Sequence, residues 1–280
     1  MAGWFKHYRQ NKLLWAGGAM VLLITVVALA APLLSPFDPT QVQVDERLHG
    51  PCQDNLMGTD GYGRDILSRI IYGARFSLSL SLAVVAANMV LGLLIGSTAG
   101  YLGGMVDEFI MRTVDLLMAF PGIILALCIV GVLGPSMHNL FIALVALGWV
   151  GYARIARGLV LSLKEQCFID AARGLGGSGW YIIVYHVIPN IVPSLIILAA
   201  MHVGHAILAI ASLSFLGLGV QPPTPEWGTM LNEGKQFIFT HPHVIFFPGV
   251  SVTVTVFAFN ILGDGLRDLL DPRARDIIKT

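Results

Sequence analysis

Long apolar segments without charged residues recur along this sequence, and they limit how the chain can fold more than any other feature. The first of them, Leu13 to Leu34, has 22 consecutive residues without a charge. A run of about 20 apolar residues is enough for a helix to cross the hydrocarbon core of a bilayer. Only 12% of the whole chain is charged, against about a quarter in soluble domains. The pattern therefore predicts an all-α integral membrane protein.

We predict six membrane-spanning helices, at residues 13–34, 76–100, 109–133, 140–161, 191–215 and around 249–262. The first segment is too long for a signal peptide and has no clear cleavage site, so we expect it to be retained. The third span contains Pro121, which should kink the helix because proline lacks the backbone N–H that a helix interior uses.

Basic residues indicate the orientation of these spans. Residues 1–12 carry Lys6, Arg9 and Lys12 and should form a cytoplasmic N-terminus. Of the 17 Lys and Arg residues, 12 fall on the inner side that this assignment implies. Six spans then place both termini in the cytoplasm, including a charged tail at residues 267–280.

Residues 35–75, between the first two spans, form a polar insert that should lie outside. Within it, Leu56 to Arg75 predicts a turn followed by an amphipathic helix with its isoleucines on one face. Asp60 or Gly63 could cap the start of this helix. We expect the helix to lie at the membrane interface, before the second span.

Two patterns within the spans predict how the helices pack. Small residues recur at four-residue steps in the second span, at Gly92, Gly96 and Gly100, and such a stripe lets two helices approach closely. Arg112 and Asp115 lie three residues apart in the third span and should pair on one helix face.

The sequence offers no catalytic or nucleotide-binding signature. It lacks HExxH, GxSxG and GxxxxGK[ST], so an ATP-driven process would need its nucleotide site on another chain. The net charge is zero, which gives no reason to expect nucleic acid as a partner. The three cysteines, Cys52, Cys128 and Cys167, match no metal or redox spacing and are expected to be unreactive.

Phe168 to Pro189 is a polar stretch between two apolar segments, on the predicted cytoplasmic side. It reads as a short helix, a break at the glycines from Gly176 onward, and an apolar, aromatic helix that ends at Pro189. A glycine permits the sharp change of direction that a hairpin needs. We interpret this hairpin as a docking surface for a cytoplasmic ATPase. Asp170 would face the partner, or cap the helix start, or both.

Two pairs of histidines are candidate ligands. His202 and His205 lie three residues apart in the fifth span, so they share a face and could meet one metal ion. Alternatively, they hydrogen-bond to neighbouring helices, as polar residues in spans often do. His241 and His243 flank a proline in the last external loop. They too could bind a metal ion or only form hydrogen bonds, and metal binding is less favoured for this pair than for His202 and His205.

Several motifs of this sequence resemble those of a known protein family. The pattern D170-A171-A172-x3-G176-x9-H186-x-I188-P189 resembles the EAA loop of ABC importer permeases, with Asp170 in place of the usual Glu and His186 in place of the usual Ile. LMGTDGYGRDILSRIIYGAR, AGYLGGMVDEFIMRTVDLLMAFP, SFLGLGVQPPTPEWGTML and FNILGDGLRDLLDPR are similar to the second permease subunit of the dipeptide, oligopeptide and nickel importer group.

The resemblance implies a type I ABC importer permease fold in the bacterial inner membrane, with a core at residues 76–266. Residues 162–190 would be the cytoplasmic coupling loop, and its coupling residues would be Asp170, Ala171, Ala172, Gly176 and Pro189. The resemblance also implies a paralogous permease, two ATPase subunits that bind ATP and Mg²⁺, and an extracytoplasmic substrate-binding protein. This chain would hold no cofactor itself.

The expected substrate depends on weaker signals. MHVGHAIL, which contains His202 and His205, resembles the nickel branch and favours nickel or a nickel chelate. GVQPPTPEWG resembles importers of dipeptides and oligopeptides equally well, so these peptides remain the alternative substrates. A rival class, a membrane scaffold or channel that does not use ATP, predicts no ATPase partner.

Overall fold

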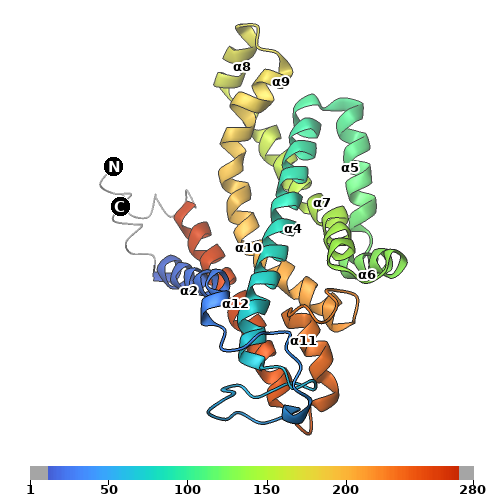
Figure 1. Ribbon diagram of the computed structural model, residues 1–280. Helices are drawn as coiled ribbons and strands as arrows, with labels where there is room; N and C mark the ends of the chain where they lie inside the picture. Colours follow the sequence, from blue (N-terminus) through green and yellow to red (C-terminus); the bar gives the residue numbers. More distant parts are fainter. Residues whose placement is uncertain (1–11, 271–280) are drawn as a thin grey trace. The chain divides into compact units, whose positions relative to one another are not determined.

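The computed structural model describes residues 12–270, and this part of the chain is helical without a β-strand. Its α-helices are α2 (Lys12–Leu29), α3 (Ala31–Leu34), α4 (Ile66–Leu102), α5 (Gly104–Met118), α6 (Gly122–Leu133), α7 (Met137–Leu163), α8 (Cys167–Gly174), α9 (Gly179–Ile182), α10 (Ile188–Phe215), α11 (Trp227–Gly234) and α12 (His243–Leu270) (Figure 1). Short 3₁₀ turns cover Val44–Glu46 and Lys235–Phe237, and a π-helical turn covers Ile183–Val187.

Five stretches of helix are long and apolar enough to cross a membrane: Lys12–Leu29, Ile66–Leu102, Met137–Leu163, Gly179–Phe215 and His243–Asp268. A sixth span is present if α5 and α6 are counted together. These two helices meet at 86°, so the kink predicted at Pro121 is a full break. Pro121 lies directly before α6, where its missing N–H leaves no helical hydrogen bond unmade.

The chain divides into two compact units. The first combines residues up to Leu82 with 130–140 and the chain from Ala200 onward, and the second contains residues 83–129 and 141–199. In the first unit, α2 packs against α12. A Cβ at Gly17 would collide with the backbone of Leu262, and one at Gly265 would collide with the backbone of Leu14. The two helices therefore touch backbone to backbone.

In the second unit, the second half of α4 packs against α7 through the predicted glycine stripe. Gly92 faces Tyr152 and Ala153, Gly96 faces Ala153, and Gly100 faces Val160. This confirms the prediction that the stripe brings two helices close together. The core of the unit consists of buried apolar side chains from α4, α7, the α8–α9 segment and the first part of α10: Leu93, Tyr152, Ala156, Val160, Ile169, Ile182, Val187, Ile191 and Leu195.

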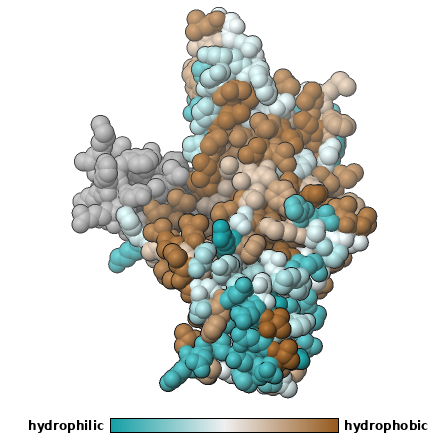
Figure 2. Space-filling model, viewed as in Figure 1, coloured by the Kyte–Doolittle hydropathy of each residue, from teal (hydrophilic) through white to brown (hydrophobic). Residues whose placement is uncertain are grey.

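The insert differs from its prediction in two respects. No separate interfacial helix precedes the second span, because α4 runs without interruption from Ile66 to Leu102. Gly73 lies near the expected junction but stays within the helix, and no proline stands there to end the first helix. The cap is also different: Asp65, rather than Asp60 or Gly63, accepts a hydrogen bond from the backbone N–H of Ser68 at 2.7 Å. Figure 2 shows a mainly hydrophilic surface over the insert and mainly apolar surface over the long helices.

The predicted Arg112–Asp115 pair is wrong. Arg112 instead lies 3.8 Å from Glu108, one turn earlier on the same helix, with both side chains exposed. Asp115 forms its ion pair with Arg154 of α7. The neighbouring helix therefore supplies a closer basic partner than the next turn of α5 does.

Candidate functional site

The segment between α7 and α10 forms a helical hairpin, as the sequence indicated. Helices α8 and α9 are joined by a tight turn in which Gly176 has a φ of +84°. This is the left-handed region that glycine adopts readily and other residues avoid. Nothing lies within 4 Å of the position that a Cβ would take at Gly176. The turn therefore requires glycine because of its backbone conformation. A side chain at this position would have enough space.

Helix α8 has a buried side and an exposed side. Ile169 is fully buried in the core, whereas Asp170 and Ala171 are exposed and Ala172 is half-buried. Asp170 makes no capping hydrogen bond. Its carboxylate lies 3.4 Å from Arg173, one turn further along the same helix. The residues of α8 that were predicted to contact an ATPase therefore present small and acidic groups outward, while their neighbour Ile169 anchors the helix.

Large apolar side chains that face away from the protein gather on this hairpin. Leu175, at the turn, is 90% exposed. Four aromatic residues of the hairpin are also exposed: Phe168, Trp180, Tyr181 and Tyr185. An apolar patch of this kind on an otherwise polar segment is typical of a protein-binding surface. We had not predicted these aromatic residues as part of the site, although GWYIIVY directly after the glycine turn could have indicated them.

Pro189 does not end the helix, contrary to the prediction. The chain stays helical from Gly179 to Phe215, with the π-helical turn Ile183–Val187 directly before Pro189. In this turn the N–H of Ile188 bonds to the carbonyl of Ile183, five residues earlier. The wider turn accommodates a proline, which has no N–H to donate and would clash with the preceding turn of a regular α-helix.

His202 and His205 lie on one face of α10, as predicted, with ring centroids 5.9 Å apart. His205 is exposed, and its Nδ1 lies 3.2 Å from the carbonyl oxygen of Met201. Within residues 12–270, no group of three or more His, Cys, Asp or Glu side chains is arranged to hold a metal ion. The pair can therefore offer two nitrogen ligands from this chain, and other ligands would have to come from elsewhere.

Comparison with known proteins agrees with this architecture. Residues 92–276 match the family described as binding-protein-dependent transport system inner membrane component, and residues 2–51 match the N-terminal TM domain of oligopeptide transport permease C. The chain belongs to this permease family.

Relatives of this permease are named for the transport of three different substrates. It is 42% identical to the glutathione transport system permease protein GsiD of Pectobacterium atrosepticum, over 97% of this chain and 90% of the relative. It is equally identical to the dipeptide transport system permease protein DppC of Alkalihalophilus pseudofirmus, over 97% and 89%. The nickel transport system permease protein NikC of Escherichia coli is also 42% identical, over 90% of this chain and 91% of the relative.

Among solved structures, the permease resembles the inward-facing MetNI methionine ABC transporter. The TM-score is 0.50 at 18% identity, over 74% of this chain and 98% of that chain, which supports a shared type I ABC importer permease fold. The chain is thus a permease subunit of an ABC importer in the peptide and nickel group, and it is a transport subunit rather than an enzyme. Equal identity to glutathione, dipeptide and nickel permeases does not distinguish among their substrates.

Proposed function

We propose that this permease forms half of a translocation path with a second, paralogous permease, and that the hairpin within residues 162–190 couples it to separate ATPase subunits. ATP and Mg²⁺ would bind to those subunits, and an extracytoplasmic binding protein would deliver the substrate. Both termini and the hairpin would lie in the cytoplasm. The observation that carries the proposal is the hairpin itself, which has buried aliphatic residues on one side and exposed leucine and aromatic side chains on the other.

This construction suits the transmission of movement. Ile169 of α8 and Ile182 of α9 are fully buried in the same core as residues of α4 and α7. A partner that displaces the exposed tip would therefore move a packed unit instead of bending a loose loop. Alternating access would follow: closure of the ATPases moves the hairpin, the spans behind it open outward, and hydrolysis resets them.

The sharpest test places a charge on the tip without disturbing the fold. Leu175→Asp changes a side chain that is 90% exposed, so the protein should still insert and fold. We expect loss of ATPase co-purification and at least a tenfold loss of ATP-driven uptake. Val44→Asp, at another exposed apolar position in the insert, is the matched control and should retain both. Wild-type ATPase binding and uptake in Leu175→Asp would contradict the coupling role.

Variants of the predicted coupling residues extend this test. Asp170→Ala removes an exposed charge whose one ion pair is a weak contact to Arg173. Gly176→Val forces a side chain into the left-handed backbone region and should distort the turn. Both should reduce uptake while membrane insertion is preserved. Unchanged uptake in both variants would mean that the hairpin does not transmit the movement.

For the substrate, we propose a nickel chelate that contacts His202 and His205. Imidazole nitrogen suits nickel, and the two rings lie close together on one face. A bare ion would find only these two ligands here, whereas a chelate brings donor atoms of its own and needs few from the protein. Small peptides are the second candidate, because relatives at the same identity are named for glutathione and dipeptide transport.

The two candidates separate in a strain that lacks this permease. Radioactive nickel uptake, with and without added histidine as chelator, and growth on a required dipeptide are measured after complementation. His202→Ala/His205→Ala should lower chelated nickel uptake at least tenfold, and His138→Ala, at an exposed histidine of α7, should not. Full nickel uptake by the double variant would refute ligation. Growth on the dipeptide without any nickel uptake would select the peptide importer.

A further inference from the structure

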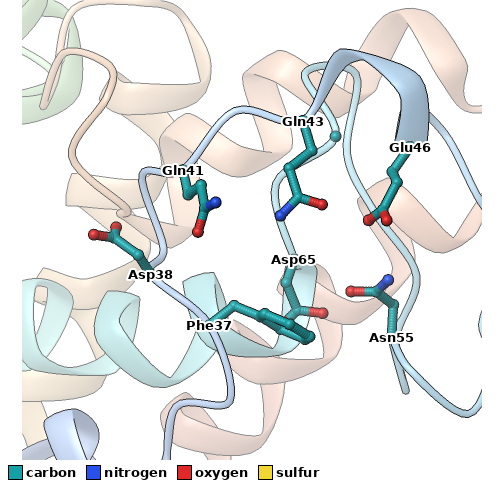
Figure 3. Close-up of a pocket in the computed structure, with 8 residues that line it drawn as sticks. Phe37, Asp38, Gln41, Gln43, Glu46, Asn55 and Asp65 are labelled. Atoms are coloured by element: carbon teal, nitrogen blue, oxygen red, sulfur yellow. The ribbon is translucent and has the colours of Figure 1, made fainter.

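The insert between α3 and α4 contains a small pocket, here called the insert pocket, that is lined mainly by oxygen-bearing side chains. Its lining residues are Phe37, Asp38, Gln41, Gln43, Glu46, Asn55, Gly63 and Asp65. Figure 3 shows the side chains of Gln43, Glu46, Asn55 and Asp65 turned toward the same space, whereas Asp38 points away from it. Two carboxylates and two carboxamides thus surround one small volume.

Asp65 has an unmet interaction in this pocket. The residue is only 5% exposed, and its Oδ2 accepts hydrogen bonds from the N–H and the hydroxyl of Ser68, each at 2.7 Å. Its Oδ1 is buried and has no hydrogen-bond partner in the structure. A buried carboxylate oxygen without a partner is costly, because burial removes it from bulk water. A cation or a hydrogen-bond donor in the pocket would therefore stabilise this oxygen.

Arg64 and Arg69 form no ion pair with Asp65, because both are paired with other acids in a buried network. The network contains two arginines and two acids, so its formal charge is zero: Arg64–Asp60 at 2.7 Å, Arg64–Glu233 at 2.8 Å, Arg69–Glu233 at 2.9 Å, and Arg69–Asp60. Among residues 12–270, neither Asp65 nor Glu46 has an ion-pair partner. Two negative charges at the pocket therefore lack a countercharge.

We propose that the insert pocket binds a calcium ion through the carboxylates of Asp65 and Glu46 and the amide oxygens of Gln43 and Asn55. Calcium is a hard cation that takes six to eight oxygen ligands in flexible arrangements, from carboxylates, amide and backbone carbonyls and water. Its double charge would neutralise the two uncompensated acids. Nickel and zinc prefer nitrogen or sulfur ligands, and none of the lining side chains carries an imidazole or a thiol.

The ion would tie separate parts of the insert together. Glu46 ends the 3₁₀ turn Val44–Glu46, Asn55 lies in the following loop, and Asp65 caps the start of α4. A site with two charged ligands is expected to be weak, with a dissociation constant of about 10⁻⁴ to 10⁻³ M, as in other extracellular calcium modules. This inference is independent of the proposed substrate and of the coupling role.

The test uses the complete importer, purified in detergent without nucleotide and stripped with a chelator. Binding of radioactive calcium is measured by equilibrium dialysis, and thermal unfolding is followed as CaCl₂ is added. Glu46→Gln is the primary variant because its side chain makes no hydrogen bond in the structure, so the change removes a charge without removing a contact. Asp45→Asn alters the exposed neighbour outside the pocket and is the matched control.

We expect wild type and Asp45→Asn to bind one more calcium ion per copy of this chain than Glu46→Gln, whose affinity should fall at least tenfold. The melting temperature of wild type should begin to rise as calcium approaches the dissociation constant and should continue to rise with the logarithm of its concentration above it. MgCl₂ at the same concentrations should have little effect, because magnesium requires a regular octahedral site. Equal binding and equal thermal shifts in wild type and Glu46→Gln would overturn the proposal.

Discussion

Replacing Gly96 with alanine tests whether α4 and α7 are held in direct backbone contact. A Cβ at this position would lie 2.9 Å from the Cα and the carbonyl carbon of Ala153, and closer still to its carbonyl oxygen. These are backbone atoms of a helix, so they cannot rotate away as a flexible side chain can. The two helices would have to separate, which would also loosen the neighbouring contact of Gly92 with Tyr152.

The magnitude follows from a matched substitution. Gly158 lies on α7 with nothing within 4 Å of a would-be Cβ, so Gly158→Ala adds a methyl group without a collision. Both substitutions replace glycine with alanine in a helix and should gain the same intrinsic helix stability, about 1 kcal/mol. The difference in stability between the two variants therefore isolates the steric cost at Gly96. Overpacking a tight contact costs about 1–3 kcal/mol. For a protein of this size, each kcal/mol shifts Tm by about 2–4 °C, so Gly96→Ala should melt about 2–12 °C below Gly158→Ala.

Tryptophan fluorescence during heating in detergent micelles measures this difference, and Trp149 lies on α7 one turn before the contact with Ala153. The comparison is made at one detergent concentration with both variants purified in parallel. A Gly96→Ala protein that melts with or above Gly158→Ala would refute the reasoning. It would mean that the two helices can move apart at no cost, and that the glycine stripe does not determine their spacing.

Two further substitutions test the buried polar groups of the insert and α11. Arg69→Met should lower the free energy of unfolding by about 3–5 kcal/mol, because it removes a buried positive charge that pairs with Asp60 and Glu233. Measured by urea unfolding, the added substitution Glu233→Gln should recover part of this loss. No recovery would contradict the ionic explanation. Glu226→Ala should lower the free energy of unfolding by about 0.5–2 kcal/mol, because the buried carboxylate caps α11. In the same urea measurements, Glu226→Gln should show a smaller loss because it keeps a hydrogen-bond acceptor. Equal losses in the two variants would refute the capping role.

The elements that were predicted well depend on local sequence. Apolar runs of sufficient length fix where helices can cross a membrane, whatever they pack against. The glycines at positions 92, 96 and 100 were predictive for a similar reason, since a stripe without side chains is useful only where another backbone approaches. The helix starting at Ile66 was misjudged because a change from polar to apolar composition does not by itself end a helix.

The ion pairs were harder to predict because their partners are distant in sequence. Asp115 and Arg112 have favourable spacing on one helix, yet Asp115 pairs with Arg154, 39 residues away. Arg157 likewise reaches Asp107 at 2.6 Å, across 50 residues. Spacing along one helix shows which residues can meet. It does not show that a neighbouring helix offers a better partner, and this requires the packing of α5 against α7.

The candidate sites were predictable to different degrees. The hairpin was recognisable because a glycine turn in a polar stretch between apolar segments is a local pattern, and Gly176 adopts the conformation that this pattern requires. The insert pocket was not recognisable, because Glu46, Asn55 and Asp65 come from three different parts of the insert and none belongs to a spacing motif. Its strongest signal, the unpartnered oxygen of Asp65, exists only in the folded chain.

Helix α9 and the histidine pair belong to one helical stretch, Gly179–Phe215, of 37 residues. No loop intervenes that could absorb a displacement of the hairpin. The two places where the helix departs from regular α geometry, the π turn Ile183–Val187 and Pro193, both lie nearer the hairpin than the histidines. Bending of this stretch is therefore easiest next to the hairpin.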